Sequence, residues 1–345
     1  MSPQISIILL SSLATGTVIT MTSHHWLMAW IGLEVNTLAI IPIISATNNP
    51  RATKAATKYF LTQASASAMI LFSSMINAWQ TGTWDITNLS SEPSHILLTM
   101  ALAMKLGLVP THFWLPEVLQ GSTMATALII VTWQKLAPMA LIYLTINNLS
   151  TVVLISLGLL SSVIGGWGGL NQTQTRKIMA FSSITHLGWM TAISTIMTNI
   201  MILNLVIYLI MTTALFYSLI LSKSKTIQDT TTAWTLSPTL TTMMMILLLS
   251  LGGLPPLTGF MPKWLILEEL IIQNLIPAAT TLAMSALLSL FFYLRLAYTT
   301  TLTLSPNTIQ TKFKWRFKLK PITSLMMTSS TISIFLLPLT PLMLL

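Results

Sequence analysis

The sequence predicts an all-α protein that crosses a membrane many times. Of its 345 residues, 53% are apolar and only 7% are charged, and the mean hydropathy is +0.78. Soluble domains carry about 25% charged residues, so this chain cannot form an ordinary water-facing surface. Its apolar stretches of about 20 residues have the length that spans a bilayer core as a helix. These observations exclude a hydrated globular enzyme and a disordered chain.

Eleven apolar segments follow one another along the chain, and we expect each to form a transmembrane helix. The first lacks a basic region and a small-residue cleavage site, so we expect it to be retained and not removed as a signal. The fourth and ninth contain paired prolines and glycines, and the sixth carries the close-packing pair Gly165 and Gly169. In order, the segments are 3–21, 25–46, 55–80, 95–118, 123–146, 149–170, 174–197, 199–222, 238–272, 276–301 and 322–344.

Positive charge gathers in alternate loops, which supports this helix count because Lys and Arg collect on one side of a membrane. Loops after even-numbered segments hold twelve of the sixteen Lys and Arg residues, whereas Asp85 and Glu92 lie in a loop after an odd-numbered one. The twelve are Arg51, Lys54, Lys58, Arg176, Lys177, Lys223, Lys225, Lys312, Lys314, Arg316, Lys318 and Lys320. The N-terminus then lies on the cationic side and the C-terminus on the opposite side. Membrane topology therefore explains most of the net charge of +9 and argues against nucleic-acid binding.

Two similar strings suggest an internal repeat. LGLVPTHFWLPE begins at Leu106 and LGGLPPLTGFMPK begins at Leu251, five helices later. An odd number of helices reverses the chain direction, so we expect two inverted five-helix repeats, with helices 4 and 9 broken. The expected parts are 1–147 and 148–302 for the repeats, and 303–345 for a basic loop with a C-terminal helix.

The prolines in these strings lack an N–H group and release backbone carbonyls. Irregular backbone at membrane depth persists only inside protein or beside a water-filled cavity. We therefore expect helices 4 and 9 to flank an aqueous path, although a simple kink is the alternative.

Four cations are left unexplained by topology, namely Lys105, Lys135, Lys263 and Arg295, and Glu34 joins them in the middle of helix 2. A charge in the centre of the bilayer costs about 2.5–3.5 kcal/mol when it faces lipid. The three lysines and Glu34 are therefore expected to face one another or water. Arg295 is near the cationic side, where we expect it to snorkel as an anchor.

Buried lysines suit proton transfer, because burial and neighbouring charges change their proton affinity strongly. We assign proton transfer to Lys105, Lys135 and Lys263, with Glu34 modulating Lys105. Static ion pairing is the alternative. His112 and His186 are either proton relays or hydrogen-bonded packing residues.

Redox and metal chemistry are not expected in this chain. It has no cysteine, no phosphate-binding or dinucleotide-binding glycine motif, and no paired mid-helix histidines. The adjacent His24 and His25 do not make a metal site. Glu117, Glu268 and Glu269 are near helix ends, where interface and channel-mouth roles are equally open.

Several strings closely resemble the mitochondrially encoded chain 2 family of NADH–ubiquinone oxidoreductase, which belongs to the antiporter-like subunits of respiratory complex I. The strings are WIGLEVNTLAIIP, MALAMKLGLVPTHFWLPEVLQG, WQKLAP and LGGLPPLTGFMPKW. The resemblance implies that Glu34 and Lys105 form a pair on a hydrated axis. Lys135 would be the connecting residue of this axis, and Lys263 would end it. The family pattern has fourteen helices, three more than expected here.

The resemblance also implies a location and partners: the mitochondrial inner membrane, other complex I subunits, and basic loops facing the matrix. NADH, flavin, iron–sulfur clusters and ubiquinone would belong to the parent complex, since no cofactor is expected in this chain. The function expected is proton translocation coupled to redox chemistry elsewhere. The alternatives are a free-standing cation/proton antiporter and a non-conducting structural subunit. The basic segment Lys312–Lys320 could bind anionic lipid.

Overall fold

The computed structural model describes residues 2–235 and 237–302, with short pieces at 327–328, 330–332, 334 and 337–339. Over these residues the regular elements are fourteen α-helices and the 3₁₀-helices η1 (Ala233–Thr235) and η3 (Leu337–Leu339). The predicted class, an all-helical polytopic membrane protein, is confirmed. The helices are α1 (Pro3–Thr22), α2 (Trp26–Ser45), α3 (Pro50–Thr81), α4 (Glu92–Leu106), α5 (Trp114–Gly121), α6 (Met124–Val131), α7 (Trp133–Thr145), α8 (Thr151–Gly169), α9 (Thr175–Ser194), α10 (Thr198–Ser222), α11 (Ile227–Thr231), α12 (Pro238–Gly252), α13 (Phe260–Ile272) and α14 (Ile276–Thr301).

Seven helices of the described chain are long and apolar enough to cross a membrane, counting α6 and α7 as one. The number is lower than expected mainly because the segments at 95–118 and 238–272 are each divided into two short helices. The division leaves irregular backbone at 107–113 and 253–259, where the sequence predicted breaks. A further interruption, at Thr132, was not expected. Most of the eleventh segment, 322–344, is outside the described residues.

Several cations expected in loops are instead helical. Arg51, Lys54 and Lys58 belong to the first turns of α3, and Arg176 and Lys177 to the first turn of α9. In α3 the reason is local, because Asn49 adopts the extended N-cap conformation and Pro50 takes the first helical position, where its missing N–H costs nothing. In each unit, cations expected in loops therefore belong to the N-terminal turns of a helix.

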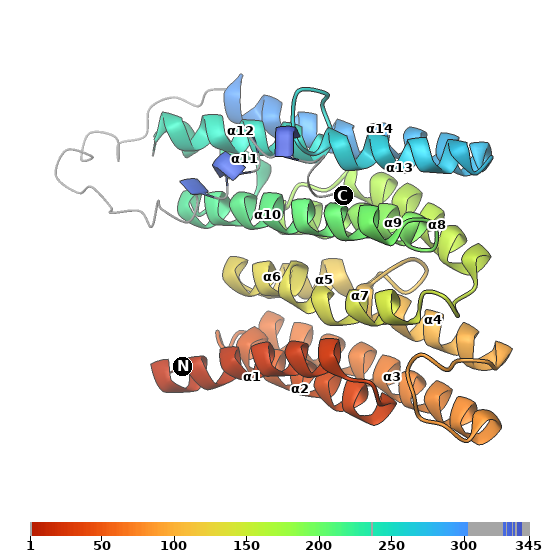
Figure 1. The fold of residues 1–345 in the computed structure, drawn as a ribbon. Coiled ribbons are helices and arrows are strands. Elements are labelled where there is room, and N and C mark those ends of the chain that lie inside the picture. The colour runs from red at the N-terminus through yellow and green to blue at the C-terminus, as the bar shows by residue number, and fades with distance from the viewer. Residues whose placement is uncertain are drawn as a thin grey trace. The chain divides into compact units, whose positions relative to one another are not determined.

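The chain folds as two compact units, and each is described by itself. The first comprises residues 1–161 and 191–198. In this unit α2 packs between α1 and α3, and α3 also packs on α4 and α5 (Figure 1). Helices α1 and α2 approach closely through Gly16 and Gly32, because a Cβ at Gly32 would lie 2.8 Å from the Gly16 carbonyl oxygen. Small residues permit this kind of contact between membrane helices.

The second unit comprises residues 162–190 and 199–345. Here α12 packs on α14, and α11 and α13 also pack on α14 (Figure 1). Helix α9 is unusual here, because every residue from Ser182 to Met190 is buried. It is also absent from the seven apolar spans, since serine, threonine and histidine interrupt its sequence.

Candidate functional site

Two buried lysines occupy the first unit. Lys105 is in the last turn of α4 with 5% of its surface exposed, and Lys135 is in the first turn of α7 with 2% exposed. The ammonium group of Lys105 has no hydrogen-bond partner within the described part of the chain. An unpaired ammonium in a dry interior would cost several kcal/mol, so this group requires water or a partner.

The ammonium group of Lys135 donates a hydrogen bond to the backbone carbonyl of Leu106. In a continuous helix that carbonyl would accept from the N–H of residue 110, but Pro110 has no N–H. Helix α4 stops at the same point, because Gly107 adopts a left-handed conformation (φ 78°) and its N–H bonds back to Ala103. The helix break therefore supplies the oxygen that holds Lys135.

A small cavity lies beside both lysines. Its volume is about 10 Å³, which is about the least that can hold one water molecule. The amide atoms of Asn36, which also lines the cavity, have no partner among the residues described. The polar residues that line it include Asn36, Thr37, Tyr59, Gln63, Lys105, Gln134 and Lys135. Unpaired donors and acceptors around a space of this size are the conditions that bind an internal water.

Glu34 is close to this centre without forming an ion pair in the described structure. Its carboxylate accepts a hydrogen bond of 3.4 Å from Thr37, and it is within electrostatic reach of Lys105 and Tyr59. Glu34 is half-buried in α2 and does not line the cavity, whereas Thr37 does. The structure thus brings Glu34, Lys105 and Lys135 together, with Glu34 at the edge.

His112 occupies the break between α4 and α5. It is buried, its ring packs against Phe113, and its Nδ1 atom has no partner in the described residues. It does not line the cavity beside the lysines. The structure therefore places His112 in the break but does not connect it to Lys105.

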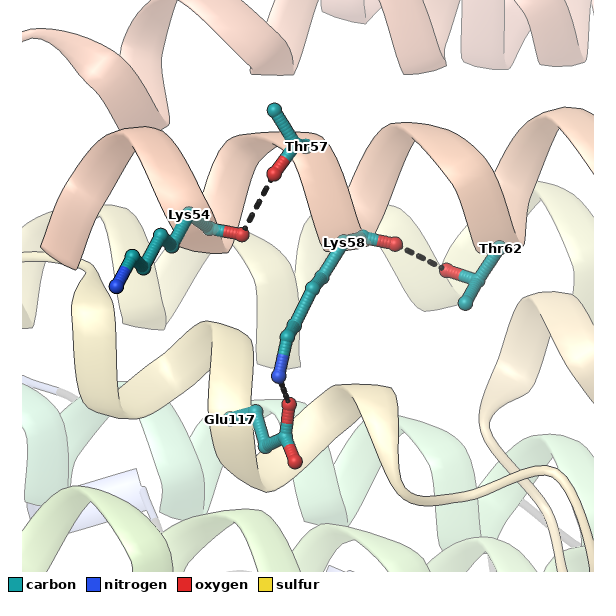
Figure 2. Close-up of polar contacts among 5 residues, drawn as sticks. All are labelled: Lys54, Thr57, Lys58, Thr62 and Glu117. Carbon is teal, nitrogen blue, oxygen red and sulfur yellow. Dashed lines mark hydrogen bonds and ion pairs between the residues drawn. The ribbon is translucent and has the colours of Figure 1, made fainter. Parts of the chain in front are cut away.

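Glu117 forms an ion pair with Lys58, which links α5 to the first turns of α3 (Figure 2). Their side chains are 50% and 55% exposed. The two helices approach closely near this pair, since a Cβ at Gly121 would lie 2.7 Å from the Arg51 carbonyl. The pair thus secures the second half of the broken helix to α3, and Glu117 serves as an inter-helix contact.

The second unit contains a lysine held in a similar way. The ammonium group of Lys263, in α13, donates to the carbonyl of Gly252 at 2.9 Å and to that of Leu251 at 3.4 Å. A continuous helix would pair these carbonyls with residues 256 and 255, and both are proline. Gly253, with φ 84°, ends α12 as Gly107 ends α4. The same kind of break therefore holds a lysine in each unit, but from a different helix.

His186 is buried in α9, within electrostatic reach of Lys263. Its Nε2 atom is 3.4 Å from the hydroxyl of Tyr293 in α14, and its ring packs against Tyr208 in α10. The structure thus brings His186 into contact with two tyrosines.

Arg295, expected as an anchor near the cationic side, is bound to the end of a neighbouring helix. Its guanidinium donates to the backbone carbonyl of Leu170 at 2.6 Å and to that of Gln172. These carbonyls follow the end of α8, where unpaired helix carbonyls attract a cation. Arg295 therefore fastens α14 to the end of α8 within the second unit.

Several polar residues beside the lysines and His186 were not predicted from the sequence. Asn36 and Gln134 line the cavity beside Lys105 and Lys135, and Tyr208 and Tyr293 contact His186. A signal existed for the first two, because each is within two positions of an intramembrane charge in an otherwise apolar string. The residues that the structure describes contain no cluster of three potential metal ligands.

Known proteins resemble this chain over nearly its whole length. The family model described as "NADH:quinone oxidoreductase/Mrp antiporter, TM" matches residues 23–289, and "NADH dehydrogenase subunit 2 C-terminus" matches residues 290–344. The NADH-ubiquinone oxidoreductase chain 2 of Varanus melinus is 57% identical and that of Xenopus laevis 55% identical, with 99% of each chain covered.

Solved structures share the fold at lower identity. A chain of respiratory complex I from Thermus thermophilus has a TM-score of 0.89 at 24% identity, with 100% of this chain and 80% of that chain covered. A chain of the Mrp complex from Dietzia sp. has a TM-score of 0.83 at 16% identity, with 97% and 75% covered.

The family model that matches residues 23–289 defines an antiporter-like membrane subunit, and the helices broken beside lysines are part of that fold. The identity of 55–57% to chain 2 sequences then shows which of these subunits this chain is. The chain belongs to the NADH-ubiquinone oxidoreductase chain 2 family and is a membrane subunit of mitochondrial complex I.

Proposed function

We propose that this subunit translocates protons through hydrated intramembrane Lys and Glu residues, coupled to redox chemistry in other subunits. The observation that carries the proposal is the unpaired ammonium of Lys105 beside a water-sized, polar-lined cavity. A structural role would require only paired charges or apolar packing at such a position. An ammonium that faces water can instead exchange its proton.

The carbonyls of the broken helices add a second argument. Lys135 and Lys263 each contact a backbone oxygen and no carboxylate in the described structure. Helix C-terminal carbonyls carry about half a negative charge, so they stabilise a cation less than a carboxylate does. These positions can hold a proton and release it when a neighbouring charge changes. Glu34 supplies such a charge for Lys105.

The test is replacement of Lys105 or Lys263 by Met in the assembled complex, with proton-to-electron stoichiometry measured in sealed vesicles. Lys54→Met is the matched control, because Lys54 is exposed on α3. We expect Lys105→Met and Lys263→Met each to lower the stoichiometry or the coupled rate and the control to leave both unchanged. Unchanged stoichiometry together with an unchanged coupled rate in both Lys105→Met and Lys263→Met would establish the non-conducting structural role. Cation/proton exchange by the chain reconstituted alone would establish the antiporter.

We also propose that residues 1–147 and 148–302 are inverted five-helix repeats followed by a C-terminal helix, giving eleven spans. The matching ends of α4 and α12, at Gly107 and Gly253, support this repeat. The cationic helix ends and the N-terminus face the matrix in this proposal, and the C-terminus faces the intermembrane space.

Lys312–Lys320, outside the described residues, would bind anionic lipid by its charge and aromatic content. The NADH, flavin, iron–sulfur and ubiquinone sites would belong to partner subunits.

A further inference from the structure

Trp114 makes a hydrogen bond across the break between α4 and α5. It is the first residue of α5, and 6% of its surface is exposed. Its indole N–H donates to the backbone carbonyl of Met104 at 3.1 Å. Met104 is in the last turn of α4 and directly precedes Lys105. A side chain from the second half of the broken helix is therefore bonded to the backbone of the first half, next to the buried lysine.

The Met104 carbonyl can accept this bond because α4 ends beside it. In a continuous helix the carbonyl would accept from the N–H of Leu108. That N–H bonds to Ala103 instead, at 2.9 Å, and the Gly107 N–H is shared between Ala103 at 2.9 Å and Met104 at 3.2 Å. Gly107 also lets the indole come close, because a Cβ there would lie 3.3 Å from Trp114 Cζ2. The indole thus completes the hydrogen bonding of a helix end that the glycine turn leaves partly unpaired.

The same ring is part of the wall beside the two lysines. Trp114 and Tyr59 both line the small cavity that Lys105 faces. The Tyr59 ring packs edge-on against Trp114, with the ring centroids 5.7 Å apart. The Tyr59 hydroxyl is 3.5 Å from the side-chain oxygen of Gln134, the residue before Lys135. The aromatic pair thus connects α5 through α3 to α7 and limits the cavity to about one water.

The second unit shows why the bond across this break needs a separate residue. Counted from the left-handed glycines Gly107 and Gly253, Trp114 has the place of Phe260, whose side chain has no donor. There the ammonium group of Lys263, in α13, reaches back to α12 and makes the bond across the break. In the first unit the lysine that binds the end of α4 comes from α7, and α5 contains no cation. The indole of Trp114 makes the connection instead.

We propose that Trp114 is a positioning residue for Lys105: its indole N–H fixes the last turn of α4 and thereby holds the ammonium group at the cavity. This inference rests on the proposed function. Trp114 transfers no proton itself, because an indole nitrogen donates a hydrogen bond but does not accept one. Its effect is on distance, since release of the Met104 carbonyl lets the end of α4 move relative to Glu34 in α2 and Lys135 in α7. Such a movement changes the water and the charge that surround Lys105.

The experiment compares Trp114→Phe with Trp133→Phe in intact complex I in sealed vesicles. Trp133 is the matched control, because it begins α7, its indole N–H donates to the Leu13 carbonyl at 3.4 Å, and it does not line the cavity. The coupled proton translocation rate and its pH profile are measured on complexes of confirmed assembly. We expect Trp114→Phe to slow translocation by about tenfold and to move the pH profile, because a displaced proton-transfer group reacts more slowly and titrates in altered surroundings. Trp133→Phe is expected to match the parent complex.

Gly107→Ala serves if Trp114→Phe fails to assemble, because the added Cβ would push the indole away from the Met104 carbonyl. Its control is Gly82→Ala, which has the same left-handed conformation but no atom within 4 Å of its Cβ position. A parental rate and pH profile in the assembled variant overturn the positioning role.

A slower rate with an unchanged pH profile also overturns it, since that is the result of a structural defect, and so does an equal change in the control. Lys105→Met in parallel separates the two proposals. If Lys105→Met leaves both measurements unchanged, the proposed role of Lys105 in proton transfer fails as well. If Lys105→Met is defective and Trp114→Phe matches the parent complex, only the positioning role fails.

Discussion

Asn36 and Asn77 are both buried asparagines, but their amide groups have opposite surroundings. Both side-chain atoms of Asn36 lack a partner in the described structure and line the cavity beside Lys105. The amide of Asn77 donates to Asn88 at 2.7 Å and accepts from Ser90 at 3.2 Å, which holds the segment between α3 and α4. One asparagine therefore lines a cavity with its amide unpaired, and the other secures the fold.

Asn36→Leu should maintain or raise the thermal stability of the assembled complex and slow proton translocation, because it removes unpaired polar atoms and dries the cavity. Asn77→Leu should instead lower stability by about 1–3 kcal/mol, because it leaves backbone groups without partners. Thermal denaturation of the complex and proton uptake by vesicles measure the two effects. A stable Asn36→Leu complex with parental translocation would show that this cavity carries no proton.

Asp229 caps α11 at the cationic surface. Partial burial disfavours its charged form, but hydrogen bonds from the backbone N–H groups of Lys225 and Thr226 outweigh this and lower the pKa of Asp229. With Thr226 it forms a capping box, in which each side chain accepts from a backbone N–H. Because the folded pKa is depressed, this contribution is present above the ordinary carboxyl pKa and is lost as pH falls through the folded value.

Asp229→Asn should therefore loosen α11 at neutral pH by about 1 kcal/mol, the usual contribution of a helix cap. Hydrogen–deuterium exchange over residues 225–231 should accelerate by about fivefold at pH 7. The difference between variant and parent should shrink on acidification, when Asp229 itself becomes protonated. Equal exchange in the two proteins at pH 7 would contradict the capping role.

Both broken helices offer a backbone carbonyl to a lysine, but the lysine comes from a different place in the chain in each case. The carbonyl at the end of α4 receives Lys135 from α7, whereas that at the end of α12 receives Lys263 from the following helix, α13. In both cases a left-handed glycine ends the helix and a proline four residues after the carbonyl removes its helical donor. The two lysines are therefore equivalent in chemistry but not in position along the repeat.

Gly253→Ala is the sharpest test of this arrangement. A Cβ at Gly253 would lie 2.9 Å from the Lys263 ammonium nitrogen, on a backbone with φ 84°. Gly82→Ala is the control, because Gly82 has φ 73° and no atom within 4 Å of its Cβ position. Each variant should lose about 1 kcal/mol from backbone strain. Proton translocation should fall only in Gly253→Ala; an equal fall in both would show that displacement of Lys263 is unimportant.

Much of this element-level structure followed from sequence, for identifiable reasons. Apolar length located the helices, and the proline and glycine strings located the breaks at 107–113 and 253–259. The interruption at Thr132 carries no glycine and was missed. Helix packing decides which carbonyl accepts a hydrogen bond from which ammonium group. It also decides the contact between Tyr293 and His186, which are more than 100 positions apart in the sequence. Local sequence does not contain that information.

At the scale of the whole chain, the sidedness of the helix ends can be tested directly because the native sequence has no cysteine. Lys54 and Asn88 are exposed and flank most of α3. Lys54→Cys and Asn88→Cys should react with a membrane-impermeant maleimide from opposite sides, Lys54→Cys from the matrix side. Labelling in mitoplasts and inverted vesicles, located by peptide mass, measures this. Labelling of both positions from one side would contradict the topology.

The hydroxyl-rich composition of α9 has a consequence for biogenesis. A helix with this many polar side chains gains little from leaving an aqueous environment for lipid alone, so it should not partition stably into the bilayer as an isolated hairpin. It requires neighbouring helices already in place to receive those groups. A cysteine placed in α9 should therefore react with a water-soluble maleimide in ribosome-bound intermediates that end shortly after α9, and should be protected in those that extend through α14.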